Sequence, residues 1–271
     1  MHRDNSALVL LRGGGDLATG VALRLHRAGI KVVIAELLQP LAVRRAVSLA
    51  EVVYEGVHTV EEVTGRRVEH EQLFAALDAD EIPVLVDPNA EILLQLQFLV
   101  VVDARLLKTP PEPLPVKVPL RIGLGPGFHA GVNCDAVVET RRSHTLGRVY
   151  WNGTSQPDSG KPEGNPRRVL RAPQNGVMVA KAKIGEHVEE GQVVAVIGED
   201  VEYPVVSPLS GVLRGLIREG IHVTKGLKIG DIDPRDDMSA CYLVSDKALA
   251  IGGAVLEAIL TRGEIREMLW K

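Results

Sequence analysis

The chain has 271 residues, with 31 basic and 35 acidic side chains and a formal net charge of −4 at pH 7. This balance does not favour a nucleic-acid or membrane-surface partner, and no apolar stretch approaches the length of a membrane span. The two cysteines, Cys134 and Cys241, lie far apart and in no metal-ligand spacing. Together with a polar N-terminal segment, they predict a reducing, cytoplasmic location.

The first forty residues have the pattern of a strand, a glycine loop, a helix and a second strand. The apolar run 7–11 leads into Gly13-Gly14-Gly15-Asp16-Leu17-Ala18, and a second apolar run, 31–35, ends at Glu36. The loop fits G-x-G-x-x-A, in which glycines let a phosphate approach the backbone and the following helix offers free N–H groups. Glu36 stands about where an acidic residue would meet a ribose hydroxyl.

We therefore expect a phosphate or nucleotide to bind at Gly13, Gly14, Gly15, Asp16, Leu17 and Glu36. The alternative is a glycine turn that binds nothing. The carboxylate of Asp16 would repel a phosphate unless a cation or a hydrogen-bonding geometry compensates.

Further apolar runs occur at residues 51–54, 82–86, 98–102 and 120–122, with polar or helix-like segments between them. This rhythm predicts an open parallel α/β sheet, and thus a Rossmann-like nucleotide- or cofactor-binding domain over residues 1–152. A second glycine-rich loop, 123–131, follows the last run, and successive glycines can form a nest of N–H donors for an anion. Gly123, Gly125 and Gly127 are therefore candidate ligand residues, with a tight structural turn as the alternative.

Arg44 and Arg45 follow the second predicted strand. Arginines beside glycine loops suit the recognition of phosphate or pterin pyrophosphate, because a guanidinium can make two parallel hydrogen bonds. Surface arginine pairs are also common without any such role. Both residues join the candidate site, and in a doubly wound sheet they should lie near the crevice shared by the two glycine loops.

Residues 153–167 are rich in Gly, Pro, Ser and Asn and are predicted to be a linker. Beyond them, residues 168–235 contain a repeat with an offset of 35 residues and no gap. The matched positions include Pro173 and Pro208, Gly176 and Gly211, Gly185 and Gly220, His187 and His222, and Gly191 and Gly226. The repeat predicts a duplicated β-rich module. No third ligand accompanies the two histidines, so we predict no metal site.

The predicted module resembles the barrel-sandwich hybrid of biotinyl and lipoyl carrier domains. Those domains present a modified lysine between their halves, whereas residues 198–206 contain none, so we expect no covalent biotin or lipoate. Residues 236–271 include a helix-like segment, 246–260, that is expected to pack back on the first domain. Its Gly252-Gly253 pair would permit close backbone contact at a helical cost of roughly 1 kcal/mol per glycine.

Several motifs together resemble one protein family. They are residues 12–20 (RGGGDLATG), Arg44-Arg45, residues 54–56 (YEG), 123–128 (GLGPGF), 147–149 (GRV), 230–235 (GDIDPR) and 245–248 (SDKA). These residues are similar to the YqeB-type accessory proteins of selenium-dependent molybdenum hydroxylase systems. They are more loosely similar to XdhC-type proteins, which help mature xanthine dehydrogenase by handling the molybdenum cofactor.

The resemblance implies a maturation role in which a molybdopterin-type cofactor or a nucleotide is bound, modified or delivered. The implied partners are a molybdenum hydroxylase or its other accessory proteins. The alternative is an NAD(P)-dependent oxidoreductase, which would need an acid or base near the glycine loops that the sequence does not identify. A third possibility is a carrier or scaffold built on the duplicated module. No catalytic residue is assigned, and Cys134 and Cys241 are predicted to be buried rather than reactive.

Overall fold

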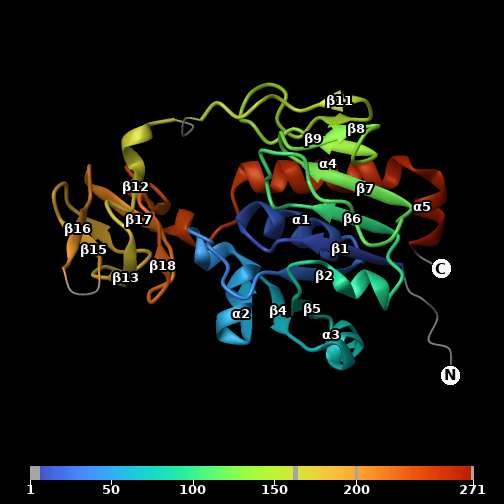
Figure 1. Cartoon of the computed structure of the whole chain (residues 1–271), viewed down its shortest axis with the longest axis horizontal. Coiled ribbons are helices and arrows are strands. Elements are labelled where there is room, and N and C mark those ends of the chain that lie inside the picture. Colours follow the sequence, from blue (N-terminus) through green and yellow to red (C-terminus); the bar gives the residue numbers. More distant parts are fainter. Residues whose placement is uncertain (1–6, 161–163, 199–200, 270–271) are drawn as a thin grey trace. The chain divides into compact units, whose positions relative to one another are not determined.

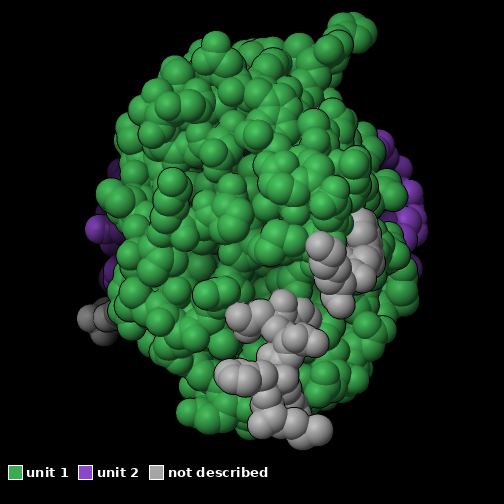
Figure 2. All heavy atoms as spheres, turned by 90° about the vertical axis from the view of Figure 1, so that its right-hand side faces the viewer, with its two compact units in different colours: residues 1–40, 49–158, 244–271 green, residues 41–48, 159–243 purple. Residues whose placement is uncertain are grey.

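The computed structural model describes residues 7–160, 164–198 and 201–269 (Figure 1). The chain forms two compact units. Unit 1 comprises residues 1–40, 49–158 and 244–271, and unit 2 comprises residues 41–48 and 159–243. Figure 2 colours the two units and presents one face of unit 1. Within the three described ranges, no helix is both long and apolar enough to cross a membrane.

Unit 1 is built on a large sheet whose described strands run in the order β10-β9-β7-β6-β1-β2-β5-β4-β3. The strands are β1 (Leu8–Arg12), β2 (Lys31–Glu36), β3 (Val57–Val60), β4 (Val63–Arg67), β5 (Ile82–Val86), β6 (Val100–Asp103), β7 (Leu120–Leu124), β9 (Ala136–Val138) and β10 (Val149–Tyr150). The inner strands are parallel to one another, whereas β3 and β10 pair antiparallel at the two edges. A small antiparallel pair, β8 (His129–Ala130) and β11 (Gly153–Thr154), lies outside this sheet.

Two helices of unit 1, α1 (Asp16–Arg27) and α4 (Asp246–Thr261), lie side by side against the sheet (Figure 1). Their backbones touch at two glycines. A Cβ atom added to Gly20 would lie 2.5 Å from the backbone of Ala248, and one added to Gly252 would lie 2.3 Å from the oxygen of Gly20. The glycines therefore permit a helix contact that any side chain would prevent. The shorter helices of this unit are α2 (Val52–Glu55), α3 (Leu73–Asp78) and α5 (Gly263–Met268).

The apolar core on one face of the sheet joins Leu10 of β1 to Leu73 of α3 and to Leu93 of the 3-10 helix Glu91–Leu94. Residues 114, 116 and 118, from the proline-rich segment before β7, pack against the same core. Because side chains alternate along a strand, Arg12 at the end of β1 points to the same face as Leu10. This face therefore changes from apolar to charged toward the carboxyl ends of the strands.

Unit 2 contains two antiparallel sheets, in the orders β12-β19-β17-β14 and β16-β15-β13-β18. The strands are β12 (Val169–Arg171), β13 (Gly176–Ala180), β14 (His187–Val188), β15 (Val193–Ile197), β16 (Tyr203–Val206), β17 (Gly211–Leu216), β18 (His222–Val223) and β19 (Lys228–Asp233). Strand β14 of the first half pairs with β17 of the second, and β18 of the second pairs with β13 of the first. Residues 35 positions apart adopt matching conformations, since φ is 152° at Gly176 and 155° at Gly211.

The prediction of a Rossmann-like parallel sheet joined to a barrel-sandwich-hybrid-like module is wrong. The large sheet is mixed, because β3 and β10 run antiparallel to their neighbours, and the remaining sheets are separate antiparallel ones. The apolar run 51–54 also falls in α2 and the 3-10 helix Leu49–Glu51 rather than in a strand. A run with three consecutive apolar residues fits a buried helical turn as well as a strand, so its periodicity could not distinguish the two.

Candidate functional site

The strand order of unit 1 reverses next to β1. The chain runs from β1 to β2 on one side, whereas β6 and β7 lie on the other side and are parallel to β1. Arg12, Asp103 and Gly123 are neighbours in register, so these three strands end at one edge. The two glycine loops therefore open on the same edge, as predicted. In open α/β sheets, ligands bind outside the carboxyl ends of the strands at such a reversal.

The first glycine loop is partly occupied by the protein itself. The N–H of Gly14 donates to Oε2 of Glu36 at 2.6 Å, and a Cβ atom added to Gly14 would lie 3.0 Å from the nitrogen of Ala50. Gly15 precedes α1 as its N-cap, and open space lies where its Cβ would be. The part of the loop that a ligand can approach is therefore Gly15 at the start of α1.

Glu36 and Asp16 each use their carboxylates within the loop. Glu36 also accepts a hydrogen bond from the N–H of Leu37 at 2.7 Å. Burial raises the pKa of Glu36, against the lowering effect of its two backbone hydrogen bonds. Asp16 accepts a hydrogen bond from the N–H of Leu17 at 3.0 Å. A ribose at Glu36 would have to replace bonds that hold the loop together.

The second glycine loop uses its glycines for packing. A Cβ atom on Gly123 would lie 2.1 Å from the Phe128 ring, and one on Gly127 would lie 2.5 Å from the oxygen of Thr109. The N–H groups of Gly125 and Gly127 donate to the oxygens of residues 138 and 107, at 3.3 and 2.8 Å. The folded loop thus has the geometry of a tight structural turn, with these two donors directed at protein oxygens.

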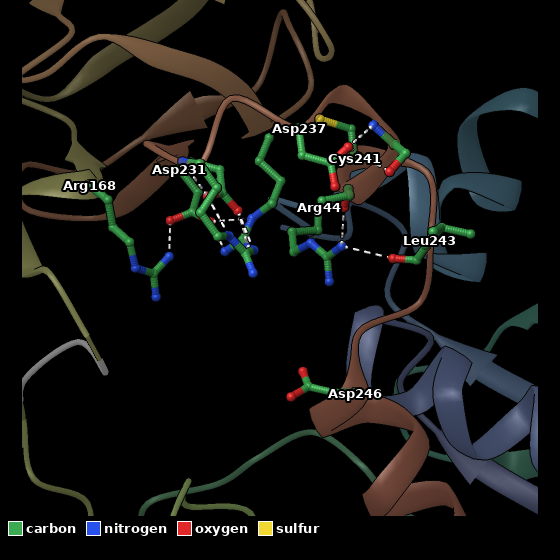
Figure 3. Close-up of polar contacts among 12 residues, drawn as sticks. Arg44, Arg168, Asp231, Asp237, Cys241, Leu243 and Asp246 are labelled. Atoms are coloured by element: carbon green, nitrogen blue, oxygen red, sulfur yellow. Dashed lines mark hydrogen bonds and ion pairs between the residues drawn. The ribbon is translucent and has the colours of Figure 1, made fainter.

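Arg44 and Arg45 lie in unit 2 rather than in the unit that contains the glycine loops. Nη2 of Arg44 donates to the oxygens of Ala240 and Leu243, both at 3.0 Å (Figure 3). Nε of Arg45 donates to the oxygen of Leu216 at 2.8 Å. These bonds attach segment 41–48 to the rest of unit 2.

A group of charged residues that sequence reasoning missed lies at the carboxyl edge. Arg12 ends β1, Arg105 follows β6 and Arg121 lies on β7, and all three face the fully buried carboxylate of Asp103. Arg105 makes a bidentate contact with Asp103, through Nε at 2.8 Å and Nη2 at 2.7 Å. Nη1 of Arg12 and Nη2 of Arg121 lie 3.5 and 3.7 Å from Oδ2 of Asp103. We call these residues, together with Glu112, the arginine cluster.

Glu112 completes the cluster from the proline-rich segment that precedes β7. Its Oε1 accepts hydrogen bonds from Nη2 of Arg12 at 2.6 Å and from Nη1 of Arg105 at 2.7 Å. Burial alone would raise the pKa of Glu112, but the hydrogen bonds from Arg105 and Arg12 lower it to about 2. Three guanidiniums thus face two carboxylates, which leaves one positive charge in excess.

Two buried nitrogen atoms of the cluster, Nη1 of Arg12 and Nε of Arg121, have no hydrogen-bond partner among the described residues. Buried polar atoms are almost always paired, so such exceptions call for an explanation. Burial lowers the pKa of Arg121; Asp103 raises it, and the neighbouring Arg12 lowers it again. The cluster therefore favours an additional negative charge.

The arginine cluster adjoins the first glycine loop. A Cβ atom on Gly13 would lie 3.6 Å from Cγ of Arg105. One sequence signal could have indicated the cluster, since Arg12 directly precedes the loop and Arg105 follows the apolar run that ends β6. The helix start and the three guanidiniums together form the candidate site.

Both cysteines of the chain are buried. Cys134 is buried, and burial raises the pKa of its thiol to about 11, so the reactive thiolate is scarce at neutral pH. Cys241 is buried as well. No group of three or more His, Cys, Asp or Glu side chains arranged to hold a metal occurs in the described ranges.

One pocket of unit 1 lies away from this site. A pocket of about 480 Å³ is lined by Leu8, Leu99 and Pro119, together with Met268 of α5. Leu8 begins β1, and Pro119 directly precedes β7. The pocket therefore lies at the amino ends of the strands, at the edge opposite the arginine cluster.

Comparison with known sequences gives one substantial match. No protein-family model matches the chain. Over 265 residues the chain is 45% identical to "Uncharacterized protein YqeB" of Escherichia coli strain K12. This similarity supports the resemblance to YqeB-type proteins and does not bear on a link to molybdenum hydroxylases. The alignment covers 96% of the chain but 48% of that relative, so the chain spans about half the relative's length.

Comparison with solved structures gives weak likenesses. They include an aspartoacylase family protein of Mesorhizobium loti (14% identity, TM-score 0.28), a succinylglutamate desuccinylase/aspartoacylase of Rhodobacter sphaeroides (13%, 0.27) and the product-bound ectoine utilization protein EutE of Ruegeria pomeroyi (10%, 0.29). Each covers 84% of this chain and 85% of the solved one. Similarity at this level supports no activity for the chain.

Proposed function

We propose that the chain is an accessory factor for a molybdenum hydroxylase, and that it binds the phosphate groups of a nucleotide or molybdopterin dinucleotide at the carboxyl edge of unit 1. One observation carries the ligand-binding part. The N-terminus of α1, open at Gly15, adjoins an arginine cluster that has an excess positive charge and two buried donors without partners. A helix N-terminus attracts anions, and guanidiniums bind phosphate through charge-assisted hydrogen bonds.

The accessory role rests on the resemblance of the sequence motifs to YqeB-type accessory proteins of selenium-dependent molybdenum hydroxylase systems. The hydroxylase partner and a cytoplasmic location belong to the same proposal. The proposal assigns no reaction to the chain. The residues that it uses for ligand binding are Gly15, Arg12, Arg105 and Arg121.

The test is calorimetric titration of the protein with pyrophosphate, comparing wild type with Gly15→Val. The valine side chain enters the open space before α1, where a phosphate would lie. Gly263→Val is the matched control, because Gly263 also begins a helix and also has open space at its Cβ position. We expect at least a tenfold loss of pyrophosphate affinity in Gly15→Val and none in Gly263→Val. Equal affinity in the two variants would exclude the start of α1 as the phosphate site.

The identity of the ligand is tested by mass spectrometry of the small molecules released from the purified protein. Thermal shifts with ATP, CTP, NAD and molybdopterin cytosine dinucleotide accompany this measurement. The proposal expects a nucleotide or pterin dinucleotide to be released and to stabilise the protein. Stabilisation by NAD alone would agree with the phosphate site but would contradict the accessory role and favour an oxidoreductase.

A further inference from the structure

We propose that Glu112 is an internal substitute for a phosphoryl group, and that Arg12 and Arg105 form the phosphoryl subsite that it occupies. This inference rests on the proposed function, because the subsite would hold a second phosphate of the ligand that binds at the start of α1. It names the class of ligand, a phosphoryl group, and the group that competes with it, the Glu112 carboxylate. The chain's own carboxylate holds the place that the ligand must take.

The geometry around Glu112 is that of a bound oxyanion. A single oxygen, Oε1, accepts one hydrogen bond from each of two guanidiniums, at 2.6 and 2.7 Å. Arg105 keeps its bidentate contact with Asp103 through two other nitrogens. Displacing Glu112 would therefore release two convergent donors without breaking the buried contact between Arg105 and Asp103.

Glu112 leaves one nitrogen of the subsite without a hydrogen bond to any described residue. The side chain of Arg12 is 3% exposed, yet its Nη1 makes no hydrogen bond within the described ranges. A terminal phosphoryl group presents three oxygens, whereas Glu112 uses one on these arginines. A phosphoryl group could therefore bridge Arg12 and Arg105 and also reach the unused donor, and its charge would offset the positive excess.

The position of Glu112 in the chain allows its displacement. Its side chain is 54% exposed, in contrast to the fully buried Asp103. It lies between β6 and β7 in a segment without helix or strand, which contains Pro110, Pro111 and Pro113. Residues 114, 116 and 118 anchor the following part of the segment in the apolar core. Rotation of one exposed side chain is therefore enough to open the subsite.

The experiment is calorimetric titration with inorganic phosphate of wild type, Glu112→Gln and Glu71→Gln. Glu71→Gln is the matched control, since it removes one negative charge from an exposed glutamate in the 3-10 helix His70–Gln72. We expect Glu112→Gln to bind phosphate about tenfold more tightly than wild type, and Glu71→Gln to match wild type. Introducing Arg105→Gln into Glu112→Gln should abolish the gain. Equal affinity in the two glutamine variants, or a gain that survives Arg105→Gln, would overturn the proposal.

Two further arms separate the possible outcomes. If acetate gains as much affinity as phosphate in Glu112→Gln, the subsite takes carboxylates and the phosphoryl assignment is wrong. If pyrophosphate binding is lost in Gly15→Val but Glu112→Gln does not change phosphate affinity, the proposed function stands and the subsite falls. If Glu112→Gln gains phosphate affinity while pyrophosphate binding is the same in Gly15→Val and wild type, the subsite stands and the larger ligand site falls.

Discussion

Each unit of the chain contains three arginines around two acidic residues, but the two groups are paired to different degrees. In unit 2, Arg168, Arg214 and Arg235 surround Asp231 and Asp233, and we call this group the aspartate cluster. Figure 3 shows Arg168 directed at Asp231. Both aspartates are buried and come from β19, two residues apart and hence on one face of the strand.

The two clusters have the same formal charge, but they differ in how many of their buried nitrogens have a hydrogen-bond partner among the described residues. In the aspartate cluster, Arg214 donates to both carboxylates, and Arg235 adds two hydrogen bonds to Asp233 at 2.9 and 2.6 Å. None of its described buried nitrogens lacks a partner, whereas two in the arginine cluster do. One acid of the arginine cluster is also exposed and lies on a segment without regular structure. The unmet donors, rather than the number of charges, are the reason for proposing the ligand site at the arginine cluster.

The largest effect on stability is expected at the aspartate cluster. Asp231→Asn removes a fully buried charge that pairs with Arg168 and Arg214, and should lower the free energy of unfolding by about 3 kcal/mol. Urea unfolding measures the loss, with Asp236→Asn as the control, because Asp236 is exposed and its loss should cost less than about 1 kcal/mol. Under native conditions pyrophosphate affinity should not change. A loss of affinity in a folded Asp231→Asn protein would contradict the structural role of this cluster.

Acid should weaken the aspartate cluster next. Hydrogen bonds from Arg235 lower the pKa of Asp233 from its ordinary 3.8 to about 2, against the raising effect of burial. The folded-state pKa is depressed, so this stabilisation is complete above about pH 4 and is lost as the pH falls through about 2. Since one pKa unit corresponds to about 1.4 kcal/mol, the shift is equivalent to about 2.5 kcal/mol, which solvent screening of the exposed Arg235 reduces to about 1–2 kcal/mol. Unfolding measured from pH 5 to pH 2 should show this slope in wild type and a smaller one in Asp233→Asn.

The smallest stability effects are expected for substitutions of the arginines. Here the two clusters should differ more in pyrophosphate affinity than in stability. Arg105→Gln leaves Asp103 near Arg12 and Arg121 and should cost about 1–2 kcal/mol together with at least a tenfold loss of pyrophosphate affinity. Arg235 is 70% exposed, so Arg235→Gln should cost less than about 1 kcal/mol and leave affinity unchanged. Thermal unfolding and calorimetry on the same two variants give both values. Equal affinities would remove the distinction between the clusters.

Local features of the chain could be predicted from its sequence. The strand, glycine loop, helix and strand of residues 8–36 form as expected. Their signals are local: the apolar periodicity marks the strands and the helix, and the backbone turns at Gly13, where φ is 95°, and at Gly29 after the helix. The repeat likewise identifies pairs such as Gly185 and Gly220, with φ at 94° and 82°. Both signals depend on short-range backbone requirements that one sequence reveals.

Features that depend on long-range pairing could not be predicted. Arg12, Asp103 and Arg121 meet because β6 pairs with both β1 and β7, and no spacing in the sequence encodes that register. The antiparallel edge strands are short, and β10 contains two residues, too few for a periodic pattern. Nothing in the pattern of residues 41–48 indicates that their arginines bind carbonyls of unit 2.

The most direct test of the ligand site is the position of a bound oxyanion in a crystal of the protein. Crystals grown without phosphate or sulfate would be soaked in tungstate, whose anomalous scattering locates the ion without prior assumptions. The account predicts a tungsten peak at the carboxyl edge of unit 1, about 4 Å from the guanidinium nitrogens of Arg12 and Arg105, with the Glu112 side chain displaced. A peak at Arg168 or Arg235 with none at this edge would contradict the account. The aspartate cluster would then be the anion site.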